Sequence, residues 1–313
     1  MNILQEYLDR EDFYNASKQL LTKELIGQAE EVSDFYSHAP FPGYGAEDTP
    51  QTLFARTKQN DFLIELKNTI KPGTTFMEIG CGTGQLSNFL ASCTLANVYG
   101  LDASIESLKI AERFASKHQL SRVKFIREDI FNLNAYPSAS IDYLWCSGVL
   151  HHTGNTWESF DAIAHLLKPG GHIFIGLYNK YGRFFTGLRQ QFVKLLGDRP
   201  ITRKVMSKLD PYLRGLNQTS DKWHAWYRDQ YLHPFETWHS IDETVRHFSD
   251  WNIETVGSIP NLCFDYNAVS KLRISEKPLQ LSPLLIRLSE LSMAFNSFGK
   301  EGGLHLLIGK KKT

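Results

Sequence analysis

The residues with the clearest chemical potential lie between positions 76 and 85. Apolar residues lead into Glu78, and Gly80, Gly82 and Gly84 then follow at alternate positions before a helical pattern begins. This order predicts a buried strand, a tight turn and a helix N-terminus in succession. Alternating glycines let the backbone turn sharply and let a ligand lie directly against it. The segment is therefore expected to bind a nucleotide-like molecule.

Spacing distinguishes this loop from other glycine-rich loops. A phosphate-binding Walker loop would end in Gly-Lys-Ser/Thr, and a dinucleotide fingerprint would place its third glycine one residue later. The pattern Glu-x-Gly-x-Gly-x-Gly resembles the first motif of class I S-adenosylmethionine-dependent methyltransferases. The resemblance implies that the loop holds the amino-acid end of the cofactor and that the glutamate meets its ammonium group, directly or through water. The implied contacts are Glu78, Gly80, Cys81, Gly82, Gly84 and Gln85. The alternative is a glycine-rich turn without a ligand.

Acidic residues follow the next two predicted strands. Asp102 ends the strand predicted at 97–101, where a carboxylate can accept hydrogen bonds from a ribose diol, with Ala103 beside it. Asp102 could also cap the helix expected at 104–115. After the strand at 123–126, the family commonly places an acidic residue against the adenine amino group. The resemblance thus implies that Asp129 and Ile130 contact the adenine, whereas Glu128 is expected to face solvent.

A fourth strand at 141–146 continues into Ser147 and Gly148, which the resemblance also places beside the cofactor. The Leu-Leu-Lys-Pro-Gly-Gly run at 166–171 is expected to close a helix and open a fifth strand at 172–177. These signatures occur in the order of the methyltransferase family and cover about residues 74–178. They predict an α/β fold with a doubly wound seven-stranded sheet of order 3-2-1-4-5-7-6, whose last strand is antiparallel.

The remaining chain predicts additions to this core. Residues 1–70 are expected to form an N-terminal helical lid, 71–180 the cofactor-binding core, and 181–232 a cap insertion. Residues 233–313 should complete the sheet, with a second insertion at about 258–302. Because ligands bind at the carboxyl ends of strands in such folds, the helical cap should cover the substrate pocket.

Composition excludes some classes of protein. Lys plus Arg equals Asp plus Glu, at 34 each, so no overall charge favours nucleic acid. The four cysteines lack metal-ligand spacing and a disulfide framework, so no metal is expected. No apolar run approaches the ~20 residues of a membrane span, and the polar N-terminus does not resemble a signal peptide. A cytoplasmic protein is expected, for which stable membrane insertion is disfavoured and a homo-oligomer remains open.

The zero net charge hides an uneven distribution. Residues 1–70 carry twelve acidic and six basic side chains, whereas 179–231 carry eleven basic and four acidic ones. Within the basic stretch, 183–196 has apolar residues at helical spacing, a pattern compatible with a membrane surface or with packing on the protein. We expect packing, and we expect the same of the apolar stripe at 284–295. The aromatic and histidine-rich segment 223–239 could line a substrate site or form core.

Methyl transfer from a sulfonium is an in-line displacement that needs alignment of the acceptor and exclusion of water. A general base is needed only for an acceptor that is protonated at neutral pH. His152 is the preferred candidate, with His151 second, because both follow the fourth strand and histidine has a suitable pKa. The candidate substrate contacts are Tyr44, Tyr178, His233 and Glu236.

These features favour an S-adenosylmethionine-dependent methyltransferase that modifies an O, N or C atom of a small-molecule acceptor, which could be anionic. A second hypothesis is an RNA or protein methyltransferase, although the Asn-Pro-Pro-Tyr type motif of base methylation is missing where 146–149 follow the fourth strand. A third is a regulator that binds the cofactor without transferring its methyl group.

Overall fold

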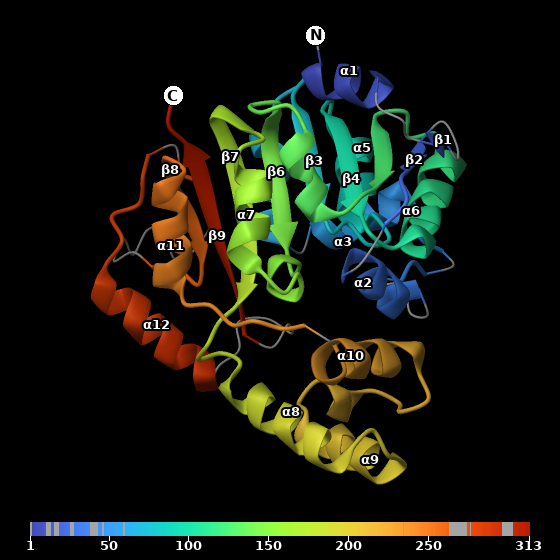
Figure 1. Cartoon of the computed structure of the whole chain (residues 1–313), viewed down its shortest axis with the longest axis vertical. Helices are drawn as coiled ribbons and strands as arrows, with labels where there is room; N and C mark the ends of the chain where they lie inside the picture. The colour runs from blue at the N-terminus through green and yellow to red at the C-terminus, as the bar shows by residue number, and fades with distance from the viewer. Residues whose placement is uncertain are drawn as a thin grey trace.

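The computed structural model describes residues 2–10, 14–15, 19–25, 28–37, 43–45, 47–58, 60–233, 235–262, 274–275, 277–295 and 303–313. Helices cover both faces of a central, mostly parallel sheet, and a separate group of helices lies beyond one end of the strands (Figure 1). Residues 38–42 of the predicted N-terminal lid lie outside the described residues, as do 263–273 and 296–302 of the predicted second insertion.

The described part of the sheet contains nine strands in the order β1-β2-β5-β4-β3-β6-β7-β9-β8. Strands β2 to β7 are parallel to their neighbours among themselves, β9 is antiparallel to β7 and β8, and β1 is antiparallel to β2. The strands are β1 (Tyr14–Asn15), β2 (Leu20–Thr22), β3 (Thr75–Ile79), β4 (Asn97–Asp102), β5 (Val123–Arg127), β6 (Ile141–Ser147), β7 (Leu167–Tyr178), β8 (Ile253–Ile259) and β9 (Leu304–Lys311).

The expectation of seven strands is therefore wrong. Two short N-terminal strands extend the edge beside β5, so the order of the sheet differs from the predicted one by these two additions. The remaining strands, β5-β4-β3-β6-β7-β9-β8, include the antiparallel strand that was expected last in the chain. A strand of two or three residues has too little periodicity to be recognised in the sequence, and only its partner β5 gives it a place in the sheet.

The helices include four before the first core strand: α1 (Ile3–Arg10), α2 (Gln28–Ser37), α3 (Pro50–Thr57) and α4 (Asp61–Thr69). The core and the cap contain α5 (Gln85–Cys93), α6 (Ile105–Lys117), α7 (Thr156–Ala164), α8 (Phe184–Leu196), α9 (Pro200–Leu209), α10 (Asp221–Tyr231), α11 (Ile241–Asp250) and α12 (Pro283–Phe295). Short 3-10 helices are η1 (Ile130–Ala135), η2 (Leu150–His152) and η3 (Leu213–Gly215). Among the described residues, no helix is long and apolar enough to cross a bilayer.

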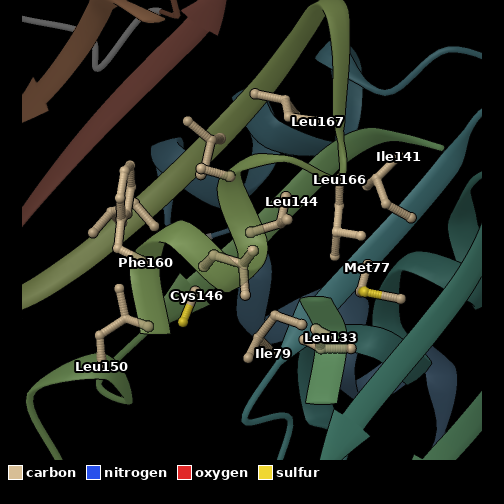
Figure 2. Close-up of a cluster of buried hydrophobic side chains, with 14 of the residues drawn as sticks. Met77, Ile79, Leu133, Ile141, Leu144, Cys146, Leu150, Phe160, Leu166 and Leu167 are labelled. Atoms are coloured by element: carbon tan, nitrogen blue, oxygen red, sulfur yellow. The ribbon is translucent and has the colours of Figure 1, made fainter. Parts of the chain in front are cut away.

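Alternate residues of β3 face opposite sides of the sheet, and each side has its own apolar core. Met77 and Ile79 belong to a cluster that includes Phe160 of α7, much of which Figure 2 shows. Phe76 points to the other side, into a cluster with Phe89 of α5. Because all five residues of β3 are buried, the strand has little freedom and fixes the position of the glycine loop that follows it.

The region between β7 and α11 forms a helical cap with a small core of its own. Helices α8, α9 and α10 with η3 pack around six buried side chains, Val193, Met206, Leu213, Trp223, Tyr227 and Tyr231. Three of these, Trp223, Tyr227 and Tyr231, are spaced four residues apart along α10, so one face of this helix supplies most of the aromatic core.

Helices α8 and α12 expose apolar side chains that were expected to be buried. Both helices were predicted to pack their apolar stripes on the protein, but Phe184, Leu188, Leu284 and Leu288 are exposed. Gly187 of α8 lies instead against the ring of Trp238, where a side chain would collide with the indole. Helical periodicity identifies the residues that share a face, but only the tertiary structure determines the direction in which that face points.

Candidate functional site

A cavity of about 620 Å³ lies where the carboxyl ends of β3, β4, β5 and β6 meet the cap and the N-terminal helices. This is the edge at which ligands bind in open α/β sheets. The glycine loop forms one wall, α10 contributes another, and the segment from α2 to α4 contributes further lining residues. Of the predicted cofactor contacts, the following line the cavity: Glu78, Gly80, Cys81, Gly82, Gln85, Asp102, Ala103, Asp129, Ile130, Ser147 and Gly148.

The glycine loop requires its glycines for two different reasons. Gly80, Gly82 and Gly84 have φ values of +68°, +51° and +71°, in the left-handed region that other residues rarely adopt. A side chain at Gly80 would also collide with Val149, and one at Gly84 would lie 2.7 Å from the Cβ of Ala111. Gly84 does not line the cavity, so its predicted cofactor contact is replaced by a packing role that lets α5 approach α6.

Glu78 lies beneath the loop and caps the first turn of α5. Its Oε2 accepts hydrogen bonds from the backbone N–H of Ser87 at 3.0 Å and from the Ser87 hydroxyl at 2.5 Å. Since the N-cap residue Gly84 has no side chain to accept this N–H, Glu78 replaces the missing cap. Burial, opposed in part by these bonds, raises the pKa of the Glu78 carboxyl to about 8. Within the described residues its Oε1 has no hydrogen-bond partner.

Asp102 connects the glycine loop to α6. Its Oδ2 accepts the N–H of Gly82 at 2.7 Å, and its Oδ1 accepts the N–H of Ser104 at 2.8 Å. Ser104, rather than Asp102, is the N-cap of α6. Burial raises the pKa of the Asp102 carboxyl despite these backbone bonds. Asp102 also lines the cavity, and a carboxylate has about four acceptor sites, so it can hold the loop and accept from a ligand.

The turn after β5 places two acidic residues at the cavity. Asp129 caps η1 by accepting the N–H of Phe131 at 3.0 Å, and Ile130 beside it is buried. Glu128 was expected to face solvent, which is wrong: its side chain is buried and lines the cavity. Glu128 Oε1 accepts from the N–H of Asp129 and from the amide of Asn132, and Oε2 lies 3.5 Å from Lys23 Nζ. Lys23 follows β2, an element that the sequence did not reveal.

At the end of β6, Ser147 and Gly148 complete the wall opposite Asp102. Gly148 has φ +79°, and a Cβ built on it would meet nothing within 4 Å. Backbone conformation therefore explains this glycine, and the space beside it is open to a ligand.

His152 lies on the cavity, and His151 lies behind it. The His152 Nδ1–H donates to the carbonyl of Phe235 at 2.8 Å, which leaves Nε2 as the basic atom of the neutral ring. His151 is fully buried, stacks on the Tyr178 ring with centroids 3.9 Å apart, and accepts the N–H of Tyr178 through Nδ1. Burial holds the pKa of His151 well below its ordinary value, so its ring stays neutral. His151 therefore supports the Tyr178 ring by packing, and the expectation that it acts as a base is wrong.

Tyr178 is the one predicted substrate contact that lines the cavity. Its hydroxyl accepts from Gln230 Nε2 at 2.8 Å, and the Arg183 guanidinium lies 3.9 Å from the ring centroid. Burial raises the pKa of Tyr178 far above the neutral range, so the phenol keeps its proton and can donate it to a ligand oxygen.

The other three predicted substrate contacts lie outside the cavity lining. Glu236 is the counter-ion of the buried Arg183, with Nη2 to Oε2 at 2.6 Å. His233 packs against the His152 ring at 3.9 Å between centroids, and burial lowers its pKa to about 3. Tyr44 stacks on Phe114 and accepts from Asn88 Nδ2. Composition suggested these residues, but their contacts show packing and charge pairing.

Several cavity residues were not assigned individually from the sequence, although those from the cap fall in the segment 223–239 that was considered as a substrate site. From the cap these are Ala225, Trp226, Arg228, Asp229 and Gln230, and from the N-terminal helices Phe35, Leu53, Arg56, Thr57, Asn60 and Leu63. Helical periodicity offered a signal on α10, because Ala225 and Asp229 share the face opposite Trp223 and Tyr227, and Trp226 lies between the two faces. No comparable signal marks α2 to α4, whose place beside the loop is a tertiary contact. The described residues contain no group of three or more His, Cys, Asp and Glu side chains placed to hold a metal.

Comparison with known proteins adds independent information. A family model described as a methyltransferase domain matches residues 70–230, about half of the chain. The chain is 30% identical over 135 residues to 27-O-demethylrifamycin SV methyltransferase of Amycolatopsis mediterranei, an alignment that covers 43% of this chain and 49% of the relative. It is 32% identical over 145 residues to phosphoethanolamine N-methyltransferase 2 of Caenorhabditis elegans, covering 44% and 33% respectively.

The chain thus spans less than half the length of these curated relatives. Among solved structures, PKMT2 from Rickettsia typhi aligns with a TM-score of 0.55 at 16% identity, over 81% of this chain and 54% of that one. The [4+2]-cyclase SpnF aligns with a TM-score of 0.51 at 14% identity, over 93% and 98%. At such identities the structural likeness concerns the fold alone. With the matched family model, the chain belongs to the methyltransferase-domain family of class I S-adenosylmethionine-dependent methyltransferases.

Proposed function

We propose that this chain transfers a methyl group from S-adenosylmethionine to an O, N or C atom of a small-molecule acceptor. The observation that carries the proposal is that one cavity contains both the glycine loop with its carboxylates and, farther along, His152 and Tyr178. The named relatives support it, since one acts on a rifamycin and the other on phosphoethanolamine. The cavity volume of about 620 Å³ favours a small acceptor over a macromolecular one.

The residues present fit the cofactor. Among the described residues, the space beside Gly148 is open and Glu78 Oε1 accepts no hydrogen bond. The space gives room for a cationic amino-acid group, and the oxygen can accept a hydrogen bond from it. Asp102 offers lone pairs to a ribose, and Asp129 with Ile130 offers a carboxylate and an apolar surface to a base. When bound, the cofactor supplies an electrophilic methyl group on a sulfonium.

The chain itself must align the acceptor, take up its proton where needed and exclude water. His152 can accept a proton at Nε2, because the Phe235 carbonyl fixes the Nδ1–H tautomer. Tyr178 can donate a hydrogen bond to the acceptor, and Gln230 holds the phenol in place. Trp226 supplies an aromatic face from α10, the helix that covers this part of the cavity. These groups perform orientation and proton transfer, the steps in which a methyltransferase depends on its protein.

The test combines cofactor binding with transfer of a labelled methyl group. The protein should bind S-adenosylmethionine in calorimetry and label a component of a small-metabolite extract. His152→Ala should lower turnover by roughly a hundredfold for an acceptor that must lose a proton, and should leave cofactor affinity unchanged. His224→Ala is the matched control, because His224 is exposed and lies outside the cavity lining.

Other results would assign another function. Labelling of RNA or protein in place of metabolites would support a macromolecular methyltransferase. Cofactor binding with no labelled product in any pool would identify a cofactor-binding regulator. Normal turnover in His152→Ala would show that this histidine has only a structural role.

A further inference from the structure

Helices α8 and α12 carry large apolar side chains on their outer faces. On α12 the exposed residues Leu284, Leu288, Leu291 and Phe295 follow a helical i, i+4, i+7, i+11 pattern. On α8 the exposed residues Phe184, Leu188 and Leu195 occupy the same positions of an equivalent stripe. We call the set the outer apolar face: Phe184, Phe185, Leu188, Leu195, Leu284, Leu288, Leu291 and Phe295, with exposed fractions from 43% to 84%.

The two stripes form one continuous surface. The rings of Phe185 and Phe295 lie 6.2 Å apart between centroids, so the end of α12 meets the start of α8. Figure 1 shows the two helices following one another along the side of the molecule away from the central strands. Each helix has thirteen residues, so together they span roughly 40 Å. Large contiguous apolar surfaces of this kind mark interaction sites on folded proteins.

Polar side chains hold these helices from the inside. Arg183 at the start of α8 is fully buried and pairs with Glu236 at 2.6 Å. Glu290 of α12 is also buried, and its Oε1 accepts from Asn179 Nδ2 at 3.0 Å and from the N–H of Ile241 at 2.7 Å. Buried charged groups thus anchor both helices alongside buried apolar residues such as Val193 and Ile286, while large Phe and Leu side chains face outward. These buried bonds prevent the helices from rotating to hide their apolar stripes.

The cap helices that continue from the α8 end of the outer apolar face carry positive charge. Lys194, Arg199, Lys204 and Lys208 of the cap are exposed and form no ion pair within the part of the chain that the structure describes. Ile201 is 62% exposed and lies on the same face of α9 as Lys204 and Lys208. Asp198, the acidic residue between α8 and α9, is already paired with Arg203 at 2.6 Å. A surface with outward Phe and Leu and a basic border is complementary to an anionic lipid bilayer.

We propose that the outer apolar face docks this protein onto an anionic membrane surface, with α8 and α12 lying in the plane of the lipid headgroups. A second copy of the chain fits less well, because a two-fold interface would bring the basic borders of both copies together. The docked helix α8 also touches the roof of the cavity: Gln190 donates to the carbonyl of Gln230 at 2.9 Å, and α10 lines the cavity. Docking would therefore hold α10, which lines the cavity, close to the lipid surface.

The test is sedimentation of the full chain with vesicles of phosphatidylcholine alone and of phosphatidylcholine with phosphatidylglycerol. Wild-type protein should bind the anionic vesicles, and binding should weaken as salt rises from about 0.1 M to about 1 M. Leu188→Asp and Leu288→Asp should each reduce the partition coefficient at least tenfold. Replacing Lys204 or Lys208 by Gln should reduce it about fivefold per residue. Leu95→Asp is the matched control: Leu95 is 57% exposed and follows α5 at the opposite end of the strands.

Cofactor affinity should stay at the wild-type value in all these variants, since none of the changed residues lines the cavity, and this measurement also reports folding. The proposal is refuted if wild-type protein fails to bind anionic vesicles at low salt, or if Leu188→Asp binds as well as Leu95→Asp. Light scattering gives a separate outcome: a wild-type dimer that Leu188→Asp converts to a monomer would show that the surface joins two copies. That result would also overturn membrane docking.

Discussion

Replacing Glu78 by Gln should make the ligand-free protein more stable and its cofactor affinity weaker. Burial raises the pKa of the Glu78 carboxyl from an ordinary value of 4.5 to about 8. Between these two pH values the folded protein holds a proton that the unfolded chain has released, so stability falls as pH rises. At 1.36 kcal/mol per pH unit, the loss reaches about 3 kcal/mol at pH 7 and about 5 kcal/mol above pH 8. A neutral glutamine avoids this cost.

The glutamine can keep the structure that Glu78 supports. Its Oε1 can accept from the N–H and the hydroxyl of Ser87, the two groups that bind the carboxylate Oε2. The substitution therefore changes charge while the cap of α5 is preserved. It removes the charge that would meet the cofactor's ammonium group, and affinity should fall by ~1.5–3 kcal/mol, the usual worth of a hydrogen bond to a charged group.

The assay is urea denaturation of wild type and Glu78→Gln from about pH 5 to pH 9, with calorimetry of S-adenosylmethionine binding in parallel. The unfolding free energy of wild type should decline relative to that of the variant across this range. Wild-type affinity should also rise with pH up to about 8, because an ammonium group favours ionised Glu78. Equal pH slopes, or a variant less stable than wild type at pH 9, would refute the assigned pKa and the reasoning built on it.

Two further predictions concern the carboxylate and glycine positions of the same loop. Asp102→Asn should weaken cofactor binding by ~1.5–3 kcal/mol in calorimetry, and unchanged affinity would remove Asp102 from the site. Gly84→Ala and Gly148→Ala impose a similar left-handed backbone cost, since their φ values are +71° and +79°. Only Gly84→Ala also crowds Ala111, so chemical denaturation should show it to be less stable than Gly148→Ala by ~1–3 kcal/mol. Equal stabilities would mean that this part of the core can relax.

Local chemistry made the glycine-loop side of the cavity predictable. Glu78, the alternating glycines and Asp102 are separated by short, fixed stretches of strand, turn and helix. Because parallel strands end at one edge of the sheet, residues at those ends must converge whatever surrounds them. The family resemblance could therefore be recognised from short segments, and the lining of the cavity includes nearly all the residues assigned to the cofactor.

The side of the cavity near the cap was less predictable because it depends on contacts between distant elements. His233 and Glu236 have suitable side chains, yet one packs on His152 and the other neutralises Arg183. Trp226 reaches the cavity only because the cap's own core orients α10. In the same way, β1 and β2 acquire their structure by pairing at the edge of the sheet, beside β5.

The sequence by itself determined the βα order, the glycine loop and the carboxylates at the strand ends, because each follows from local periodicity and spacing. The tertiary structure decided which groups line the cavity near the cap and which way the cap helices turn. Amphipathic spacing assigns residues to a face without assigning the face to core or solvent. Buried partners such as Glu236 for Arg183 and Asn179 for Glu290 make that choice, and they turn the apolar stripes of α8 and α12 outward.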